Sequence, residues 1–510
     1  MRRSTLPPPV TMALATAALL LCASPVMAKT DVTVETGRLQ GVAAEGVAAF
    51  KGIPYAAPPV GDRRWRPPAP PTAWDGPRKA DAFGPDCMQN PLPGAKSAYP
   101  PSEDCLYLNV WTPEAAAGPL PVLVWVPGGG FLTDSAANPV LDGTRLAARG
   151  VVVVTFNYRL GRFGFFAHPE LTRESGDGPT GNWGFMDQIA ALDWVRRNIA
   201  VFGGDPGNVT FIGESAGGES VTRLMSSPAA RGRFHKAVAI SGGGRDRWPA
   251  LADAEAKGVA FARDAGAADL AGLRALPAEK VRGGITLLDK EEKTWSGPMT
   301  DGRIIVGDLM ARFGAGAEPP IPFIVGANDD EFSFVPAMFR MFLNGPHLKS
   351  IEPNEAAVRA AYGSDAAMRR AIASDVVFVE PSVALARRHA ATGAPTWLYR
   401  FGYVAEAKRE KDSGAGHASD LPFHFDTLEK AGITPTAADQ AAARMMGGLW
   451  TRFARTGDPN GDGPNGEKLP EWPRYDPATP RMLSIGVETK AVTADEPVIN
   501  AIAKARDATP

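Results

Sequence analysis

Ser215 has the sequence context of a serine nucleophile. It lies in Gly213-Glu-Ser-Ala-Gly217, directly after the apolar run 209–212 and shortly before the helical stretch 220–226. A G-x-S-x-G pattern between a strand and a helix is typical of the nucleophile elbow, a tight turn that exposes the serine hydroxyl at the carboxyl edge of a sheet. Glycines flank the serine because a Cβ at those positions would clash. An ordinary glycine turn is the alternative interpretation of so short a pattern.

An acyl-transfer reaction also needs N–H donors for the negative oxygen of its tetrahedral intermediate. The backbone N–H of Ala216, the residue after Ser215, is placed to be one of them. The sequence Pro127-Gly-Gly-Gly-Phe131 follows the apolar run 122–126, and its glycines would let the backbone approach a substrate carbonyl closely. We therefore predict an oxyanion hole formed by Gly129, Gly130 and Ala216. For the glycine run, a plain turn at the end of a strand is the alternative.

Several apolar runs along the chain would position these residues. They are continuous rather than alternating, which indicates strands buried on both faces; they lie at 121–126, 151–155, 209–212, 237–240 and 323–325. Helical stretches such as 187–198 and 220–226 lie between them. Strands that alternate with helices predict an α/β fold with a large, mostly parallel central sheet.

Composition and charge exclude several classes of protein. The chain has 510 residues, of which 44% are hydrophobic and 22% charged, and these values are typical of a globular protein rather than a disordered or fibrous one. Its formal net charge of -2 gives no basic footprint for nucleic acid. We expect no nucleic-acid partner.

The first 28 residues have the pattern of a signal peptide. Arg2 and Arg3 precede an apolar stretch over 11–23, and small residues around Val26-Met-Ala28 offer a cleavage site. We predict cleavage near Ala28, an exported (periplasmic or secreted) protein, and one domain over residues 29–510. A lipoprotein signal that uses Cys22 is the alternative, although Leu21 stands where a small residue is normally needed. No later apolar stretch is long enough for a membrane span.

Two cysteines, Cys87 and Cys105, remain after removal of the signal peptide. In an exported chain such a pair suggests one disulfide, and two free thiols are the alternative. No histidine lies near them in the sequence, which argues against a zinc site.

The motifs, taken together, resemble the type B carboxylesterases, the cholinesterase-like branch of the α/β-hydrolase fold. The resemblance rests on blocks in family order, from about residue 31 to 485, and includes para-nitrobenzyl esterase-like proteins. The blocks are Phe50-Lys-Gly-Ile-Pro-Tyr-Ala-Ala-Pro-Pro59, Ser102-Glu-Asp-Cys-Leu-Tyr-Leu-Asn109, Gly181-Asn-Trp-Gly-Phe-Met-Asp187, the Ser215 elbow, and Trp450-Thr-Arg-Phe-Ala-Arg-Thr-Gly-Asp-Pro-Asn460. The fold that the resemblance implies has helical insertions over its active site.

The resemblance also implies the partners of Ser215. The family's acid lies in a G-x-N-x-D-E stretch, which Gly326-Ala-Asn-Asp-Asp-Glu331 matches, and this selects Glu331 where composition alone leaves Asp329 and Asp330 open. The family's base precedes Leu-Pro-Phe, as His417 does here, whereas His424 is interpreted as structural or pocket-lining. Ser215 would then be the nucleophile, His417 the base and Glu331 the residue that orients it.

Other features of the family carry over in part. The resemblance supports a Cys87–Cys105 disulfide and implies no metal and no organic cofactor. Pro127 and Phe332 depart from the family pattern, at the position before the glycines and the position after the acid. The loop between the two cysteines has no tryptophan, which argues against choline esters as substrates. Candidates for lining the pocket are Phe131, Trp183, Phe332 and Phe334, with core packing as the alternative for each.

The sequence therefore predicts a serine hydrolase that cleaves small-molecule carboxylic esters through an acyl-enzyme. An amide, carbamate or mycotoxin-type ester hydrolase could use the same three residues, because fold and triad do not fix the substrate. A non-catalytic binding protein of the same fold is a further alternative, disfavoured because Ser215, Glu331 and His417 are all present. The sequence leaves the oligomeric state open.

Overall fold

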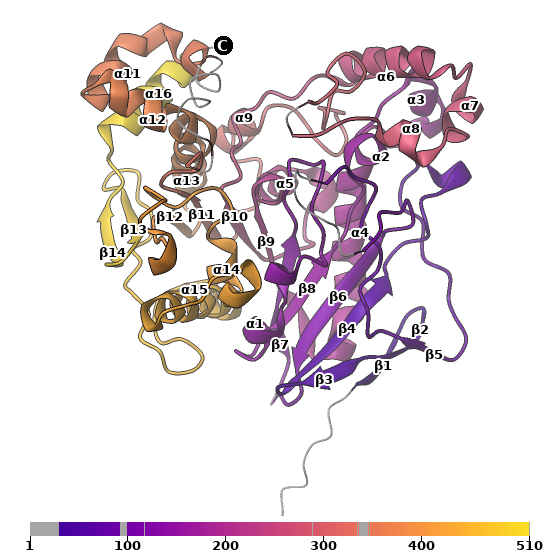
Figure 1. The fold of residues 1–510 in the computed structure, drawn as a ribbon, viewed down its shortest axis with the longest axis horizontal. Helices are drawn as coiled ribbons and strands as arrows, with labels where there is room; N and C mark the ends of the chain where they lie inside the picture. Colours follow the sequence, from indigo (N-terminus) through magenta and orange to yellow (C-terminus); the bar gives the residue numbers. More distant parts are fainter. Residues whose placement is uncertain are drawn as a thin grey trace, which may run out of the picture.

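An eleven-stranded sheet forms the centre of the protein (Figure 1). The computed structural model describes residues 30–91, 99–116, 118–287, 289–333, 335, 345 and 347–508. The strands lie in the order β14-β13-β12-β11-β10-β9-β7-β8-β6-β4-β3. Their bounds are β3 Val42–Ala44, β4 Val47–Pro54, β6 Tyr107–Pro113, β7 Leu120–Val126, β8 Val152–Phe156, β9 Gly204–Glu214, β10 Lys236–Ile240, β11 Phe323–Asn328, β12 Thr396–Phe401, β13 Arg481–Ile485 and β14 Lys490–Thr493.

The middle of this sheet is parallel and both of its ends are antiparallel. The pairings from β13 through β12, β11, β10, β9 and β7 to β8 are all parallel. The β13–β14 pair and the pairs that join β8, β6, β4 and β3 are antiparallel. This arrangement confirms the predicted mostly parallel sheet. Three short strands near the amino terminus form a separate small sheet: β1 Asp31–Val34, β2 Gly37–Gln40 and β5 Pro77–Lys79.

Each face of the sheet carries its own core. Successive side chains of a strand point to opposite faces, and in β7 Val122 and Val124 enter one buried cluster while Leu123 and Trp125 enter the other. The first cluster includes side chains of α4 (Trp183–Asn198), α5 (Ala216–Met225) and α13 (Glu380–Ala391). The second includes side chains of α1 (Thr144–Ala147), α14 (Leu421–His424) and α15 (Ala437–Thr456). Burial on both faces explains why the strands appear as continuous apolar runs.

Two groups of helices lie away from the middle of the sheet. In Figure 1, α6, α7 and α8 form one group, and α11, α12 and α16 form another near the carboxyl end of the chain. Their bounds, with those of the other short helices, are α2 Gly161–Gly164, α3 Pro169–Ser175, α6 Leu251–Ala265, α7 Leu270–Arg274, α8 Ala278–Arg282, α9 Leu309–Gly314, α11 Glu355–Tyr362, α12 Asp365–Ser374 and α16 Pro497–Asp507.

Cys87 and Cys105 form a disulfide in the structure, with an S–S distance of 2.04 Å and a sequence separation of 18. A crosslink of that span stabilises a folded chain by about 3 kcal/mol in the chain-entropy model. The predicted signal peptide, with its cleavage near Ala28, lies outside the described residues. Within the described ranges, the structure has no helix of the length and apolar character that a membrane crossing requires.

Candidate active site

Ser215 occupies a tight turn between β9, which ends at Glu214, and α5, which begins at Ala216. Its backbone has φ 56° and ψ -126°, a strained conformation for a residue with a Cβ. The turn is possible because glycines surround it: a Cβ on Gly217 would lie 2.2 Å from the carbonyl oxygen of Val126. Crossing from the sheet into the helix at this sharp angle leaves the serine side chain at the carboxyl edge of the parallel strands.

A continuous chain of hydrogen bonds joins Ser215, His417 and Glu331. The Oγ of Ser215 lies 2.8 Å from Nε2 of His417, and Nδ1 of the same ring lies 2.7 Å from Oε2 of Glu331. The Ser215–His417 distance is short enough for direct proton transfer, and the His417–Glu331 distance is short enough for a hydrogen bond that orients the ring. His417 is 202 positions from Ser215 and 86 from Glu331 in the sequence. The three residues meet because the segments after the parallel strands β9, β11 and β12 all leave the same edge of the sheet.

Glu331 is fixed from several directions. It is fully buried, its Oε1 accepts the backbone N–H of Asn328 at 2.8 Å, and its own carbonyl oxygen accepts the N–H of His417 at 2.8 Å. A carboxylate held in this way presents Oε2 to the imidazole at a constant position. The arrangement favours the tautomer in which Nδ1 of His417 donates to Glu331 and Nε2 is free to accept the proton of Ser215.

Glu214 is a residue of this site that the sequence analysis did not identify. Its Oε1 lies 3.3 Å from Nε2 of His417. Burial, with help from the neighbouring carboxylates of Asp420 and Glu331, raises the pKa of Glu214 despite the attraction of His417. Burial alone would lower the pKa of His417, but the charges of Glu214 and Glu331 outweigh it and raise that pKa to about 9. The sequence feature that could have identified Glu214 is its position directly before Ser215 at the end of a strand.

The glycine run after β7 passes directly beside Ser215. A Cβ on Gly128 would lie 3.1 Å from Cβ of Ser215 and 2.7 Å from the carbonyl oxygen of Glu214, so only glycine fits. The N–H groups of Gly129 and Gly130 donate to no acceptor within the described part of the chain. Ala216 is the first residue of α5, where an N–H has no partner inside the helix. These three predicted donors are therefore available to a substrate oxygen.

The four aromatic residues considered for the pocket have different surroundings. Trp183 is only 1% exposed and its indole N–H donates to the carbonyl oxygen of Phe166, as its core-packing alternative expects. Phe131, directly after the glycine run, is 5% exposed and packs edge-on against Phe165, Phe185 and Trp248. Phe334 lies outside the described residues.

The ring of Phe332 packs near another ring that contacts the candidate site. It lies 5.9 Å from Phe378, and Phe378 stacks on the imidazole of His417 at 4.7 Å between ring centroids. Phe378 belongs to a π-helical segment, Asp375–Val379, that joins α12 to α13. No motif marks Phe378 in the sequence, because its role depends on where an irregular helical turn places it.

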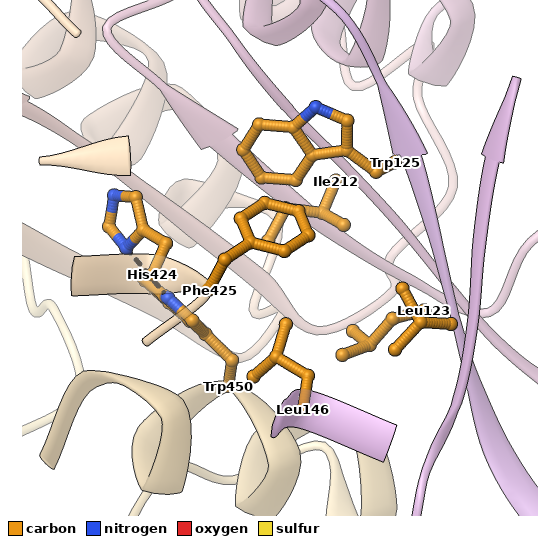
Figure 2. A pocket seen from close by; sticks show the side chains of 8 residues that line it. Leu123, Trp125, Leu146, Ile212, His424, Phe425 and Trp450 are labelled. Carbon is orange, nitrogen blue, oxygen red and sulfur yellow. Dashed lines mark hydrogen bonds between the residues drawn. The ribbon is translucent and has the colours of Figure 1, made fainter. Parts of the chain in front are cut away.

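His424 has a structural position, as the sequence analysis allowed. It is 1% exposed and lies between Asp420 and the indole N–H of Trp450, at 2.7 and 2.8 Å. With apolar side chains from β7, β8, β9, α1 and α15 it lines a small cavity on the α15 face of the sheet (Figure 2). Ser215, Glu331 and His417 do not line this cavity, so it is distinct from the candidate active site. No cluster of three or more potential metal ligands occurs in the described ranges.

Known proteins resemble this chain over most of its length. The carboxylesterase family model matches residues 28–367 and 364–500. The chain is 37% identical to fumonisin B1 esterase of Sphingopyxis macrogoltabida, over 89% of this chain and 87% of that protein. It is 34% identical to para-nitrobenzyl esterase of Bacillus subtilis (strain 168), over 90% of this chain and 95% of that protein.

Solved structures show the same relationship. A PNB esterase structure superposes with a TM-score of 0.82 at 32% identity and covers 93% of this chain and 99% of that one. A Geobacillus stearothermophilus carboxylesterase superposes with a TM-score of 0.79 at 35% identity and covers 93% of this chain and 100% of that one. By sequence and by fold, therefore, the chain belongs to the carboxylesterase family.

Proposed function

We propose that this protein hydrolyses carboxylic esters with Ser215 as the nucleophile, His417 as the general base and Glu331 as the acid that orients it. The observation that carries the proposal is the unbroken hydrogen-bond chain from Ser215 Oγ through His417 to Glu331, with distances of 2.8 and 2.7 Å. A serine hydroxyl is a weak nucleophile unless a base in contact removes its proton, and His417 is in contact.

The reaction follows from the positions of these groups. Ser215 Oγ attacks the ester carbonyl carbon while its proton passes to Nε2 of His417. The carbonyl oxygen becomes negative and is stabilised by the N–H groups of Gly129, Gly130 and Ala216. As the intermediate collapses, the C–O bond to the alcohol breaks and His417 gives its proton to the leaving alkoxide.

The acyl group is then held on Ser215 as an ester. Water attacks its carbonyl carbon as His417 takes one proton, and collapse of the second intermediate returns that proton to Ser215 Oγ. The products are the free acid and the regenerated enzyme. Throughout, the Glu331 carboxylate stabilises the imidazolium that forms in both steps. The chain's own residues account for every proton in this sequence.

Esters are favoured over amides and carbamates because the similar proteins bear esterase names: fumonisin B1 esterase and para-nitrobenzyl esterase. Fumonisin B1, which appears in the first of these names, is included in the proposal as a candidate substrate. Comparing an ester with the amide of the same acyl group would separate these reaction classes.

The proposal is tested by the hydrolysis of p-nitrophenyl acetate and butyrate by the mature protein beside its Ser215→Ala variant. We expect the wild type to cleave at least one ester and the variant to lose that activity with its circular dichroism unchanged. A fluorophosphonate probe should label Ser215 in the wild type and nothing in the variant. Full activity in the folded variant would overturn the assignment of the nucleophile.

Export is a separate part of the proposal. The amino-terminal pattern supports removal of residues 1–28, with cleavage near Ala28. Amino-terminal sequencing of the protein recovered from the periplasm or medium of an expressing bacterium should begin at Lys29. Recovery of the uncut chain in the cytosol would contradict export.

A further inference from the structure

The loop that carries the candidate oxyanion donors has an unusually strained backbone. Four of its six residues from Gly129 to Asp134 have positive φ: 80° at Gly129, 62° at Gly130, 62° at Phe131 and 85° at Asp134. Phe131 and Asp134 have a Cβ, for which this region is disfavoured. Conformations of this kind persist only where the surrounding structure holds them. The loop therefore needs an external support.

One side chain from another part of the chain binds the end of this loop. Oε1 of Gln89 accepts the hydroxyl of Thr133 at 2.6 Å and the backbone N–H of Asp134 at 2.9 Å. Nε2 of Gln89 donates to the carbonyl oxygen of Asp134 at 3.0 Å and to that of Cys87 at 3.1 Å. All four hydrogen-bonding positions of the amide are thus used. Its orientation is fixed, because the Asp134 N–H can only donate and the two carbonyl oxygens can only accept.

The bound end of the loop is connected to the donors. The carbonyl oxygen of Gly129 accepts the N–H groups of Leu132 and Thr133 at 3.0 and 3.1 Å, which closes a compact turn. A Cβ on Gly129 would lie only 2.1 Å from the carbonyl oxygen of Thr133, so the two backbones are in close contact. A displacement of Thr133 is therefore transmitted to the peptide groups of Gly129 and Gly130.

The support is itself rigid. Gln89 is 7% exposed and lies two residues after Cys87, whose disulfide with Cys105 anchors the segment. The other end of the loop has different partners: the hydroxyl of Tyr158 donates to the carbonyl oxygen of Pro127 at 3.2 Å, and the N–H of Gly161 donates to that of Phe131 at 2.8 Å. Of the Gln89 amide, the Tyr158 hydroxyl and the Gly161 N–H, the Gln89 amide is the one that binds Thr133 and Asp134.

We propose that Gln89 is a positioning residue for the oxyanion hole, acting through Thr133 and Asp134 from the disulfide-anchored segment. This rests on the proposed function, because it assigns Gly129 and Gly130 as donors to the substrate oxygen. Gln89 does not touch the substrate. Its contribution is to keep two N–H groups aimed at the point where negative charge develops, so its loss affects the transition state more than substrate binding.

The experiment uses isosteric substitutions in the mature protein. Gln89→Met keeps the volume of the side chain and removes its hydrogen bonds, and Thr133→Val removes only the hydroxyl that Gln89 binds. Thr133→Ser restores that hydroxyl. Thr112→Val is the matched control, because the hydroxyl of Thr112 is equally buried and donates to the carbonyl oxygen of Phe202 at 2.8 Å, near the opposite edge of the sheet.

We expect kcat for p-nitrophenyl butyrate, per active site titrated with a fluorophosphonate, to fall about 10-fold or more in Gln89→Met and Thr133→Val. This is less than the 10²–10³-fold typical of losing an oxyanion donor outright. KM should stay within about twofold, since ground-state contacts are unchanged. The inhibition constant of a trifluoromethyl ketone, whose adduct with Ser215 carries an oxyanion, should rise by the same factor as kcat falls. Thr133→Ser should recover most of the wild-type kcat.

A different result is expected if Gln89 and Thr133 only stabilise the fold. Their substitutions would then lower the melting temperature and the number of titrated sites, as Thr112→Val should, while kcat per site and the inhibition constant would keep their wild-type values. That outcome in Gln89→Met and Thr133→Val would overturn the proposal while the protein remained an esterase. If the wild type were inactive or Ser215→Ala fully active, the proposed function would fail instead. Equal kcat losses in Thr133→Ser and Thr133→Val would also contradict the proposed positioning role of Gln89.

Discussion

The candidate site has a proposed base side, His417 and Glu331, and a proposed oxyanion side, Gly129 and Gly130. The two sides meet at Ser215 but are held by different kinds of interaction. On the base side, His417 and Glu331 are positioned by side-chain hydrogen bonds of 2.7–2.8 Å between groups that carry or receive charge. On the oxyanion side, Gly129 and Gly130 contribute only backbone N–H groups, in a loop with positive φ at both residues. The neutral amide of Gln89 holds the end of that loop.

The comparison separates two ways of organising a reactive site. Charge-assisted hydrogen bonds are short and strong, and side chains can rotate to form them. A peptide N–H has no such freedom, because its direction is set by the backbone and the backbone by whatever supports it. The base side should therefore be sensitive to changes in its own residues, and the oxyanion side also to changes in residues that never touch the substrate.

The largest effect is expected on the base side, from Glu331→Gln. The amide can donate to Nδ1 of His417 and so stabilises the wrong tautomer, and a comparable substitution in a serine protease lowers kcat about 10⁴-fold. We expect a loss of that order in kcat/KM for p-nitrophenyl butyrate. Asp329→Asn is the control, because Asp329 lies two residues away and accepts the N–H of Ala415 rather than bonding His417. Similar losses in the two variants would remove the distinction that selects Glu331.

A smaller effect, on the oxyanion side, is expected from Gly129→Ala. The new Cβ would lie 2.1 Å from the carbonyl oxygen of Thr133, so the turn must open and its N–H groups move. We expect kcat to fall roughly 10²–10³-fold, the range for the loss of an oxyanion donor, with little change in KM. Gly203→Ala controls for backbone strain, because Gly203 has φ 84° and no atom within 4 Å of its added Cβ. Wild-type kcat in Gly129→Ala would show that this loop does not act on the transition state.

The smallest effect is expected where the two sides meet, from Glu214→Gln. General-base catalysis needs neutral His417, so activity rises as the pH passes upward through the pKa of that ring. The Glu214 carboxylate raises this pKa. Removal of this carboxylate should lower the pKa of His417 and move the acidic limb of the kcat/KM profile to lower pH, by about one pH unit.

Glu219→Gln is the control for that profile. Glu219 is also buried in the first turn of α5, but its carboxylate is bound by Arg223 at 2.9 Å and does not contact His417. The acidic limb of the Glu219→Gln profile should coincide with that of the wild type. A Glu214→Gln limb that stays in place, or moves to higher pH, would contradict the electrostatic link between Glu214 and His417.

Much of the fold could be predicted from the sequence, with errors mainly at the ends of elements. Strands buried on both faces produce long apolar runs, so the parallel part of the sheet can be recognised from the sequence. The helix expected over 187–198 begins earlier, at Trp183, because its first turn has buried apolar side chains. The burial of Trp183 could not be predicted, because an aromatic residue in a motif gives no indication of whether its ring faces a cavity or the core.

The candidate site divides in the same way. Ser215, Glu331 and His417 could be proposed because their motifs combine reactive side chains with turn residues at fixed spacing. Glu214 lay within a recognised motif and was overlooked, since its importance depends on a 3.3 Å approach to His417 from 203 residues away in the sequence. Phe378 and Gln89 have no motif at all.

The sequence by itself determined the class of fold, the family resemblance and the candidate catalytic side chains, because local patterns of apolar residues, glycines and serine are properties of short segments. Only the tertiary structure decided which groups support them: the Phe378 ring against His417, the carboxyl of Glu214 beside the same imidazole, and the Gln89 amide on the oxyanion loop. These contacts join residues that are far apart in the sequence, and their strength depends on distances of a few tenths of an ångström and on burial, which arise only when the whole chain has packed.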